Sequence, residues 1–114
     1  MRETRRILGE FTVTGEHVRD GARFPDAIAH GAFPIDIHSP SGSGMVFSEP
    51  PRGPYDIPYR ALVPRGAENV LVVGRCISAT HEGHASTRLT PMCMAMGKSA
   101  VIRASLLCSE IAAV

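Results

Sequence analysis

The run of four aliphatic residues from Val70 to Val73 constrains the fold of this chain more than any other stretch. It shows no alternation with polar residues, which is typical of a strand covered on both faces, as in a parallel sheet between helices. Gly74 ends the run and permits close approach of the backbone. We therefore predict a buried strand over residues 69–74, followed by a polar loop over residues 76–88. Because ligands of open α/β sheets lie beyond the carboxyl ends of strands, this loop is the first candidate for a binding site.

A helix is predicted to follow the loop. Thr90 is a favourable N-cap, and Pro91 suits the first helical position because its missing N–H would have no partner there. Apolar residues then recur at spacings of three and four, and this stripe comprises Cys93, Gly97, Ala100, Ala104, Leu107, Cys108 and Ile111. Its small residues near the start predict that a strand or a ligand approaches the helix closely. Met92, Met94 and Met96 are expected to fill the core.

The fold class predicted from these patterns is α+β. Residues 1–66 form a β-rich, irregular portion, and residues 67–114 form the strand-loop-helix portion. In the first portion, alternation of apolar and polar residues predicts a strand over residues 6–14. Thr14 can cap a short helix that ends at Gly21, and a further helical turn is expected over residues 25–29.

A β-hairpin and an extended segment complete the first portion. Residues 33–37 alternate between apolar and polar types, and the turn-rich residues 39–44 separate them from a second short strand at residues 45–47. Residues 55–63 are typical of an extended segment, and Pro58 places it at the edge of a sheet or at a bulge.

Length, charge and cysteine content argue against several classes of protein. The 114 residues fit one domain, and 44% hydrophobic residues are enough for a core. A net charge of +1 gives no broad attraction to nucleic acid, and no segment reaches the roughly 18 apolar residues of a membrane span. The three cysteines form no short CxxC pair, which indicates reduced thiols. We expect a cytoplasmic protein that binds no nucleic acid and has no membrane span.

The start of the predicted helix is a candidate anion site. Free backbone N–H groups and the helix dipole favour negative charge at the first turn, and Arg75 and Arg88 flank this turn in the sequence. The alternative is that both arginines are surface or ion-paired residues. The sequence contains neither GxGxxG nor GxxxxGK[ST], so a complete phosphate loop is not indicated.

Two histidines and two cysteines near this turn suggest two further kinds of chemistry. Cys76, His81, His84 and Cys93 include the ligand types of a zinc site, but their spacing matches no zinc motif, and we predict no metal. His81 and His84 suit general acid–base catalysis, or they hydrogen-bond the loop that carries them. The position of Cys93 near a helix start can lower a thiol pKa, but without a resolving cysteine nearby we favour simple packing.

Several separated motifs stand out along the chain. The main ones are GRCISATHE at residues 74–82, ASTR at 85–88, and Pro91 with CMAMG at 93–97. Others are RETRRILGE at 2–10, PIDIH at 34–38 and GPYDIPYR at 53–60. In this order they make the sequence similar, over nearly the whole chain, to the C-terminal part of a family of bacterial FAD-dependent oxidoreductases that are distantly related to fumarate reductase flavoproteins.

The resemblance implies a role for each motif. Residues 69–74 would be the last strand of a Rossmann-like FAD domain, and residues 1–66 would belong to the substrate domain. Cofactor contacts would come from Gly74, Arg75, Ser78, Pro91, Cys93, Met94, Met96 and Gly97. The candidates for the flavin or substrate side, with no individual role assigned, are Arg5, His81, His84 and Arg88.

Two departures from the family pattern shape the functional prediction. The glycine-rich motif that binds the ADP half of FAD is missing, and Lys98 and Val101 stand in a KSAV run where the family has a Gln-Ala-Ala-Gly-like run. We predict a fragment or truncated relative of an FAD-dependent oxidoreductase that contributes the flavin-closing segment and binds FAD weakly or not at all alone. Completed by an upstream half, it would act on a small-molecule substrate. The alternatives are a non-catalytic module that completes a flavin site with a separate chain, or a small anion- or metal-binding domain, and a homo-oligomer is also compatible.

Overall fold

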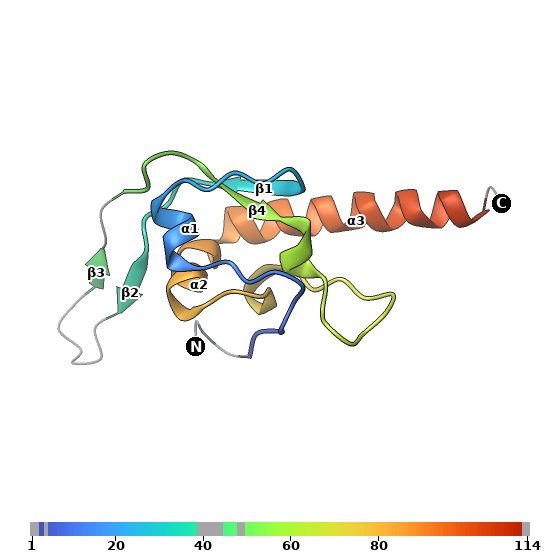
Figure 1. The fold of residues 1–114 in the computed structure, drawn as a ribbon, viewed down its shortest axis with the longest axis horizontal. Helices are drawn as coiled ribbons and strands as arrows, with labels where there is room; N and C mark the ends of the chain where they lie inside the picture. Colours follow the sequence, from blue (N-terminus) through green and yellow to red (C-terminus); the bar gives the residue numbers. More distant parts are fainter. Residues whose placement is uncertain (1–2, 4, 39–44, 48–49, 113–114) are drawn as a thin grey trace.

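The computed structural model describes residues 3, 5–38, 45–47 and 50–112. Its elements in chain order are α1 (Gly15–Arg19), β1 (Ala27–Gly31), β2 (Asp36–His38), β3 (Met45–Phe47), β4 (Tyr55–Pro58), the 3-10 helices η1 (Tyr59–Leu62) and η2 (Gly74–Cys76), α2 (His81–Thr87) and α3 (Thr90–Ala112) (Figure 1). In the described part of the chain, the strands form two antiparallel pairs, β1–β4 and β2–β3. The predicted α+β class is confirmed.

Helix α1 begins where the sequence predicts it. The Thr14 hydroxyl accepts a hydrogen bond from the backbone N–H of His17, and the His17 ring accepts one from the backbone N–H of Thr14 at 3.0 Å. This reciprocal pair satisfies two donors that a helix start would leave free. Beyond the helix, Gly21 has a φ of +63°, a conformation that glycine adopts without strain.

Strand β1 replaces the helical turn predicted over residues 25–29. Ala29, His30 and Gly31 pair with β4, opposite Ile57, Asp56 and Tyr55 respectively. This pairing outweighs the weak local preference for a helical turn, because cross-strand packing sets strand stability more than intrinsic propensity does. At Gly31 an ideal Cβ would lie 2.5 Å from Cζ of the buried Tyr55 ring, so a larger residue would displace that ring.

The predicted hairpin is confirmed, with β2 paired to β3 in register from Asp36–Phe47 to His38–Met45. Its predicted turn at residues 39–44 lies outside the described residues. The extended segment predicted over residues 55–63 is correct as far as Pro58, where β4 ends. The chain then forms η1 instead of continuing as a strand.

The strand predicted over residues 6–14 is an extended segment without a ladder. It makes isolated bridges, Gly9 to Pro64 and Val13 to Ala79, so its hydrogen bonds pass to two different segments. The predicted alternation of burial survives in part, with Gly9 and Val13 buried and Leu8 exposed at 65%. The apolar pattern identifies which face of an extended segment is covered. A β-strand also needs a neighbouring segment that pairs with it along its length.

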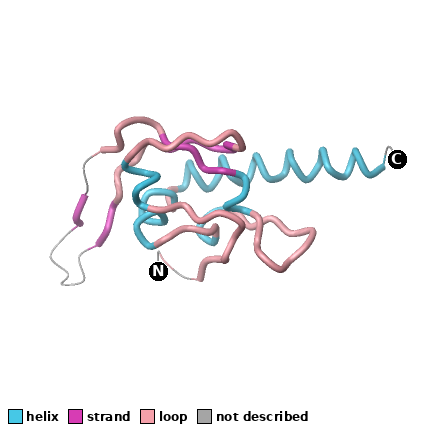
Figure 2. Tube along the Cα trace, viewed as in Figure 1, coloured by secondary structure: helices cyan, strands magenta, loops and turns pink. Residues whose placement is uncertain are grey.

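The strand predicted over residues 69–74 is wrong. Figure 2 shows this stretch as loop leading into η2, and Val70 is 50% exposed. Asn69 has a φ of +60° and Gly74 one of +75°, which breaks the extended geometry at both ends. Val72 donates to the carbonyl of Leu62 at 2.9 Å, but the described residues form no parallel sheet that this run could join.

The polar loop predicted over residues 76–88 is also wrong, because its second half forms α2. The Thr80 hydroxyl caps this helix by accepting a hydrogen bond from the N–H of Gly83 at 3.2 Å. Gly83 lets α2 lie directly on residue 13, since an ideal Cβ would stand 2.3 Å from the carbonyl oxygen of Val13. A close contact between two backbones leaves no periodic pattern of apolar residues in the sequence, so the pattern did not predict this helix.

Helix α3 starts in the body of the molecule and extends well beyond it at its C-terminal end (Figure 1). Met92 and Met96 are buried, as predicted, but Met94 is 69% exposed and does not fill the core. The predicted stripe is partly buried at Cys93, Gly97 and Ala100, whereas Ala104 and Cys108 are exposed. The covered face is thus centred on Met92 and Met96. None of the described helices is both long and apolar enough to cross a membrane.

One hydrophobic core joins the two portions of the chain. Residues before and after position 66 contribute to it, and its buried members are Val13, Val18, Ala29, Ile35, Tyr55, Ile57, Ala61, Leu62, Ile77, Ala79, Ala85, Met92 and Met96. The hydroxyl of Tyr55 lies 2.6 Å from that of Ser86, which ties β4 to α2. The core therefore fixes the start of α3 against β4 and α2, and this is where the candidate site lies.

Candidate functional site

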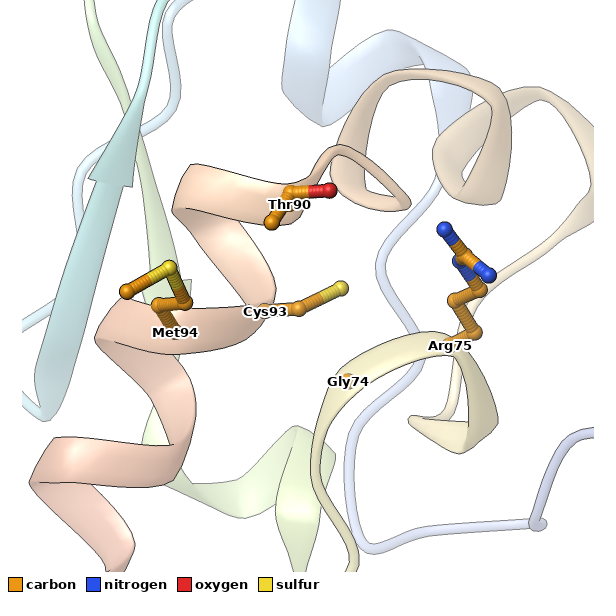
Figure 3. Close-up of a pocket in the computed structure, with 5 residues that line it drawn as sticks. All are labelled: Gly74, Arg75, Thr90, Cys93 and Met94. Atoms are coloured by element: carbon orange, nitrogen blue, oxygen red, sulfur yellow. The ribbon is translucent and has the colours of Figure 1, made fainter.

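A hollow of about 440 Å³ lies at the junction of η2 and the start of α3. Its lining residues are Gly74, Arg75, Thr90, Cys93 and Met94. Figure 3 shows the Cys93 thiol and the Thr90 hydroxyl pointing toward the side where Arg75 lies, while Met94 extends away from it. Four of the predicted cofactor contacts, Gly74, Arg75, Cys93 and Met94, therefore meet here.

A second hollow of about 250 Å³ adjoins the first. It is lined by Asp36, Arg75, Arg88, Leu89 and Thr90, so Arg75 and Thr90 line both. One charged side chain lines the first hollow, whereas three line the second. We call them the apolar hollow and the polar hollow. The two arginines that sequence analysis placed beside the first turn of the helix are indeed brought together here.

Backbone contacts hold the two arginines in place. The Nε–H of Arg75 donates to the carbonyl of Arg88 at 3.4 Å, and the ring of His84 donates from Nε2 to the carbonyl of Arg75 at 3.1 Å. Arg88 follows α2, and its Nη2 donates to the carbonyl of Asp36 at 2.8 Å. The η2 segment, α2 and β2 are thus linked around the polar hollow, and Arg75 itself stays exposed.

Asp36 is the functional candidate that sequence analysis missed. The residue is 7% exposed, its Oδ2 lies 3.9 Å from Nη2 of Arg88, and its Oδ1 has no hydrogen-bond partner among the described residues. A buried carboxylate oxygen without a partner is costly and uncommon in proteins. The available signal was a carboxylate within the apolar stretch of residues 33–37, which looked like ordinary strand alternation.

The two candidate histidines do not converge on either hollow. His84 is fully buried, and burial lowers its pKa, with the positive charge of Arg6 acting in the same direction. It is therefore neutral at pH 7 and holds Arg75 through its Nε2–H, while its Nδ1 has no partner among the described residues. The His81 side chain is 59% exposed and lies 2.8 Å from Glu3. His84 positions the site, and His81 contacts Glu3 at the surface.

The remaining predicted site residues lie outside the lining of both hollows. Ser78 is buried and hydrogen-bonded to Thr12 at 2.9 Å, Met96 lies in the core, and Pro91 and Arg5 are exposed. Gly97 is different, because no heavy atom of the described residues lies within 4 Å of an ideal Cβ there. The close approach predicted for the small-residue start of α3 is thus not made at Gly97 by the described chain.

Cys93 is a packed thiol with a raised pKa. Burial is the larger effect, and it outweighs the opposing charge of Arg75. The thiol donates to the carbonyl of Arg88 at 3.6 Å and is protonated at neutral pH. The position of Cys93 at a helix start therefore does not activate it. In the described residues, no group of three or more His, Cys, Asp or Glu side chains is arranged to hold a metal ion.

The chemistry of these hollows fits one side of a flavin cofactor. The Arg75 guanidinium and the Thr90 hydroxyl can donate to phosphate or carbonyl oxygens, and Cys93 and Met94 supply apolar surface beside them. The open space at Gly97 adds room along the helix. The residues do not fit the ADP half of the cofactor, because the sequence has no glycine-rich phosphate loop.

The fold and the site together define an α+β protein with two adjoining hollows at the start of a long helix. The family model for FAD dependent oxidoreductase matches residues 1–114. The chain therefore belongs to the FAD dependent oxidoreductase family. No curated protein and no solved structure matches it.

Proposed function

We propose that this chain forms the flavin-closing wall of a redox site, in a subgroup similar to bacterial flavoproteins of the fumarate reductase type. The observation that carries the proposal is the meeting of Gly74, Arg75, Cys93 and Met94 in the apolar hollow. These residues come from motifs that are separated in the sequence, and the resemblance implies that all four contact the cofactor. Membership of the family supports FAD as the cofactor.

In this proposal the protein binds and orients the flavin, and the flavin supplies the redox chemistry. When bound, FAD would supply two-electron redox chemistry toward a small-molecule substrate. Arg75 would place positive charge beside the cofactor, and His84 would hold the backbone of Arg75 in position. The apolar surface of Cys93 and Met94 would cover the cofactor from water.

We further propose that the chain alone binds FAD weakly or not at all. An open hollow with one guanidinium can contact part of the cofactor, but a dinucleotide needs the phosphate contacts of a glycine-rich turn as well. A Rossmann-like polypeptide that carries this turn would complete the site.

A second candidate function is a non-catalytic module that completes a flavin site with a separate chain. The exposed apolar residues Val101, Ile102 and Leu106 on α3 favour it, because they offer a surface for such a partner. Both candidates predict the same half-site, and they differ in whether the partner is covalently joined to this chain.

The experiment measures flavin absorbance after gel filtration of the chain with FAD, with and without a polypeptide that carries a strand-GxGxxG-helix motif. We expect flavin to co-elute only with both components. Arg75→Gln and Gly97→Leu should reduce the retained flavin, whereas Arg65→Gln, which changes an exposed arginine that lines neither hollow, should not. Stoichiometric flavin on the chain alone would contradict weak binding. Retention unaffected by both Arg75→Gln and Gly97→Leu would contradict the proposed wall.

A further inference from the structure

The second half of α3, residues 101–112, carries exposed apolar side chains on two nearly opposite sides. Successive residues of an α-helix are rotated by about 100°, so Val101, Ala104 and Cys108 fall on one side. Ile102 and Leu106 fall on the other. Val101 is 70% exposed, Ile102 52% and Leu106 53%, and the two smaller residues are exposed as well. A helix that is apolar all round is normally buried, so this half lacks its cover.

The first of these sides is continuous with the apolar hollow. Met94 lines that hollow and is 69% exposed. Steps of three and four residues lead from Met94 through Gly97 and Val101 to Ala104 and Cys108, which is the spacing of one helix face. At Gly97 an ideal Cβ would have no heavy atom of the described residues within 4 Å. A partner that covers this face therefore also reaches the apolar hollow.

A helix from a second copy of this chain would cover too little of α3 to form a stable dimer. The 23 residues of α3 span about 34 Å, and at a width of about 11 Å the lateral surface of the helix is about 1,200 Å². One contacting helix covers a stripe about 100° wide, which amounts to about 330 Å². Stable interfaces bury roughly 800 Å² on each partner. The area therefore favours a partner that covers more than one side of α3.

We propose that a Rossmann-like polypeptide encloses the second half of α3 on both sides and thereby closes the apolar hollow. A flat patch covers one side of a helix, whereas two nearly opposite sides need a cleft. Folds with helices packed on a parallel sheet offer such a cleft, because a helix there contacts the sheet on one side and a neighbouring helix on another. The identity of the partner rests on the proposed function, but the docking itself needs no cofactor.

The enclosure makes flavin retention depend on residues that line neither hollow. Val101 and Leu106 are absent from the lining of both hollows, and each represents one of the two exposed sides. Arg75 has the opposite character, because it lines both hollows and does not belong to α3. Docking of the partner and contact with the cofactor can therefore be separated by mutation.

The test measures docking by isothermal titration calorimetry without FAD. The chain is titrated with the polypeptide that carries the strand-GxGxxG-helix motif. We expect the unaltered chain to bind with a negative heat-capacity change, the mark of apolar burial. Val101→Lys and Leu106→Lys should each weaken docking by at least about tenfold, because each would bury an unpaired charge on one side of the helix. Ala67→Lys adds the same charge at an exposed position outside α3 and should not weaken it.

The same variants are then compared in the flavin experiment. Val101→Lys should lose both docking and flavin, whereas Arg75→Gln should lose flavin and keep docking. Circular dichroism that matches the unaltered chain would show that each variant is folded, as expected for substitutions at exposed positions.

Docking that either α3 variant leaves unchanged would overturn the enclosure, as would the absence of docking by the unaltered chain. A stable dimer of the chain alone that Val101→Lys dissociates would also overturn it, because a second copy would then cover α3. Flavin retained by Val101→Lys would overturn the closing of the hollow by this docking. Docking without any retained flavin would support the enclosure and contradict the proposed flavin wall, so the two can fail separately.

Discussion

The two halves of α3 are similar in apolar content but differ in their surroundings. In the first half, Met92 and Met96 are 6% and 0% exposed, and Ser99 donates to the carbonyl of Ile28 at 2.7 Å. In the second half, Val101 and Leu106 are 70% and 53% exposed. The difference shows that apolar side chains favour burial, but they are buried only where another part of the molecule lies against them. The first half is covered because β1 and η2 lie against it and Tyr55 of β4 contacts Met92.

Arg103, near the start of the second half, still contacts the body of the molecule. Its guanidinium lies 5.8 Å from the centre of the Tyr59 ring, at the edge of the body of the molecule. Beyond this contact the helix extends outward (Figure 1). The projecting half is held by the backbone hydrogen bonds of the helix itself. Side-chain packing also stabilises the first half.

The largest expected effect is that of Met96→Ala. Loss of a fully buried side chain in the packed half should lower the free energy of unfolding by about 2–5 kcal/mol, through lost burial and the cavity left behind. Leu106→Ala is the matched change in the exposed half and should alter it by less than about 0.5 kcal/mol. Urea denaturation measures both. A similar loss from the two variants would show that the exposed half is covered in solution.

Two glycines provide a second, smaller contrast. Gly83→Ala places a methyl group against the carbonyl oxygen of Val13 and should cost about 1–3 kcal/mol of unfolding free energy. Gly97→Ala enters open space in the helix interior and should stabilise the protein by about 0.5–1 kcal/mol. Thermal unfolding followed by circular dichroism compares them. Destabilisation by Gly97→Ala would mean that this side of α3 is already covered.

Tyr55→Phe tests how the packed half is anchored. The Ser86 hydroxyl donates to the carbonyl of Phe33 at 2.6 Å, so the Tyr55 hydroxyl donates to Ser86. Burial raises the pKa of Tyr55 to about 12, which keeps this donor in place across the neutral range. Its loss should cost about 1 kcal/mol. A double-mutant cycle with Ser86→Ala measures the coupling, and additive losses would contradict a direct bond.

The smallest effect is a pH dependence from His84. Burial lowers its pKa in the folded protein, so the unfolded chain binds the proton more readily. The contribution of His84 to stability is therefore complete above its ordinary pKa of 6.5 and declines as the pH falls below that value. Unfolding free energies at pH 7.5 and 5.5 test this direction. His84→Asn should show a weaker dependence, and equal slopes would contradict the assignment.

Local signals predicted those elements that depend on neighbouring residues. Thr14 identified α1, the turn-rich stretch identified the hairpin, and Thr90 with Pro91 identified the start of α3. The failures depend on residues far away in the sequence. Residues 69–74 have the composition of a buried strand but no parallel neighbour in the described chain, and β1 forms because β4 lies beside it.

The candidate site follows the same rule. The residues that lie in neighbouring motifs were predicted, and those that depend on distant parts of the sequence were not. Gly74, Arg75, Cys93 and Met94 were expected together because they lie in two motifs near one helix start. Asp36 was not, because its importance comes from Arg88, which is distant in the sequence and close in the fold. The helix α2 that carries His84 was missed because it packs through glycine and small residues instead of an apolar stripe.

The sharing of Arg75 by the two hollows implies thermodynamic linkage between them. An occupant of the apolar hollow that engaged this guanidinium would leave fewer donors for an occupant of the polar hollow. Each occupant would then weaken the binding of the other by the same factor. A group that captured Arg75 in either hollow would therefore act at both.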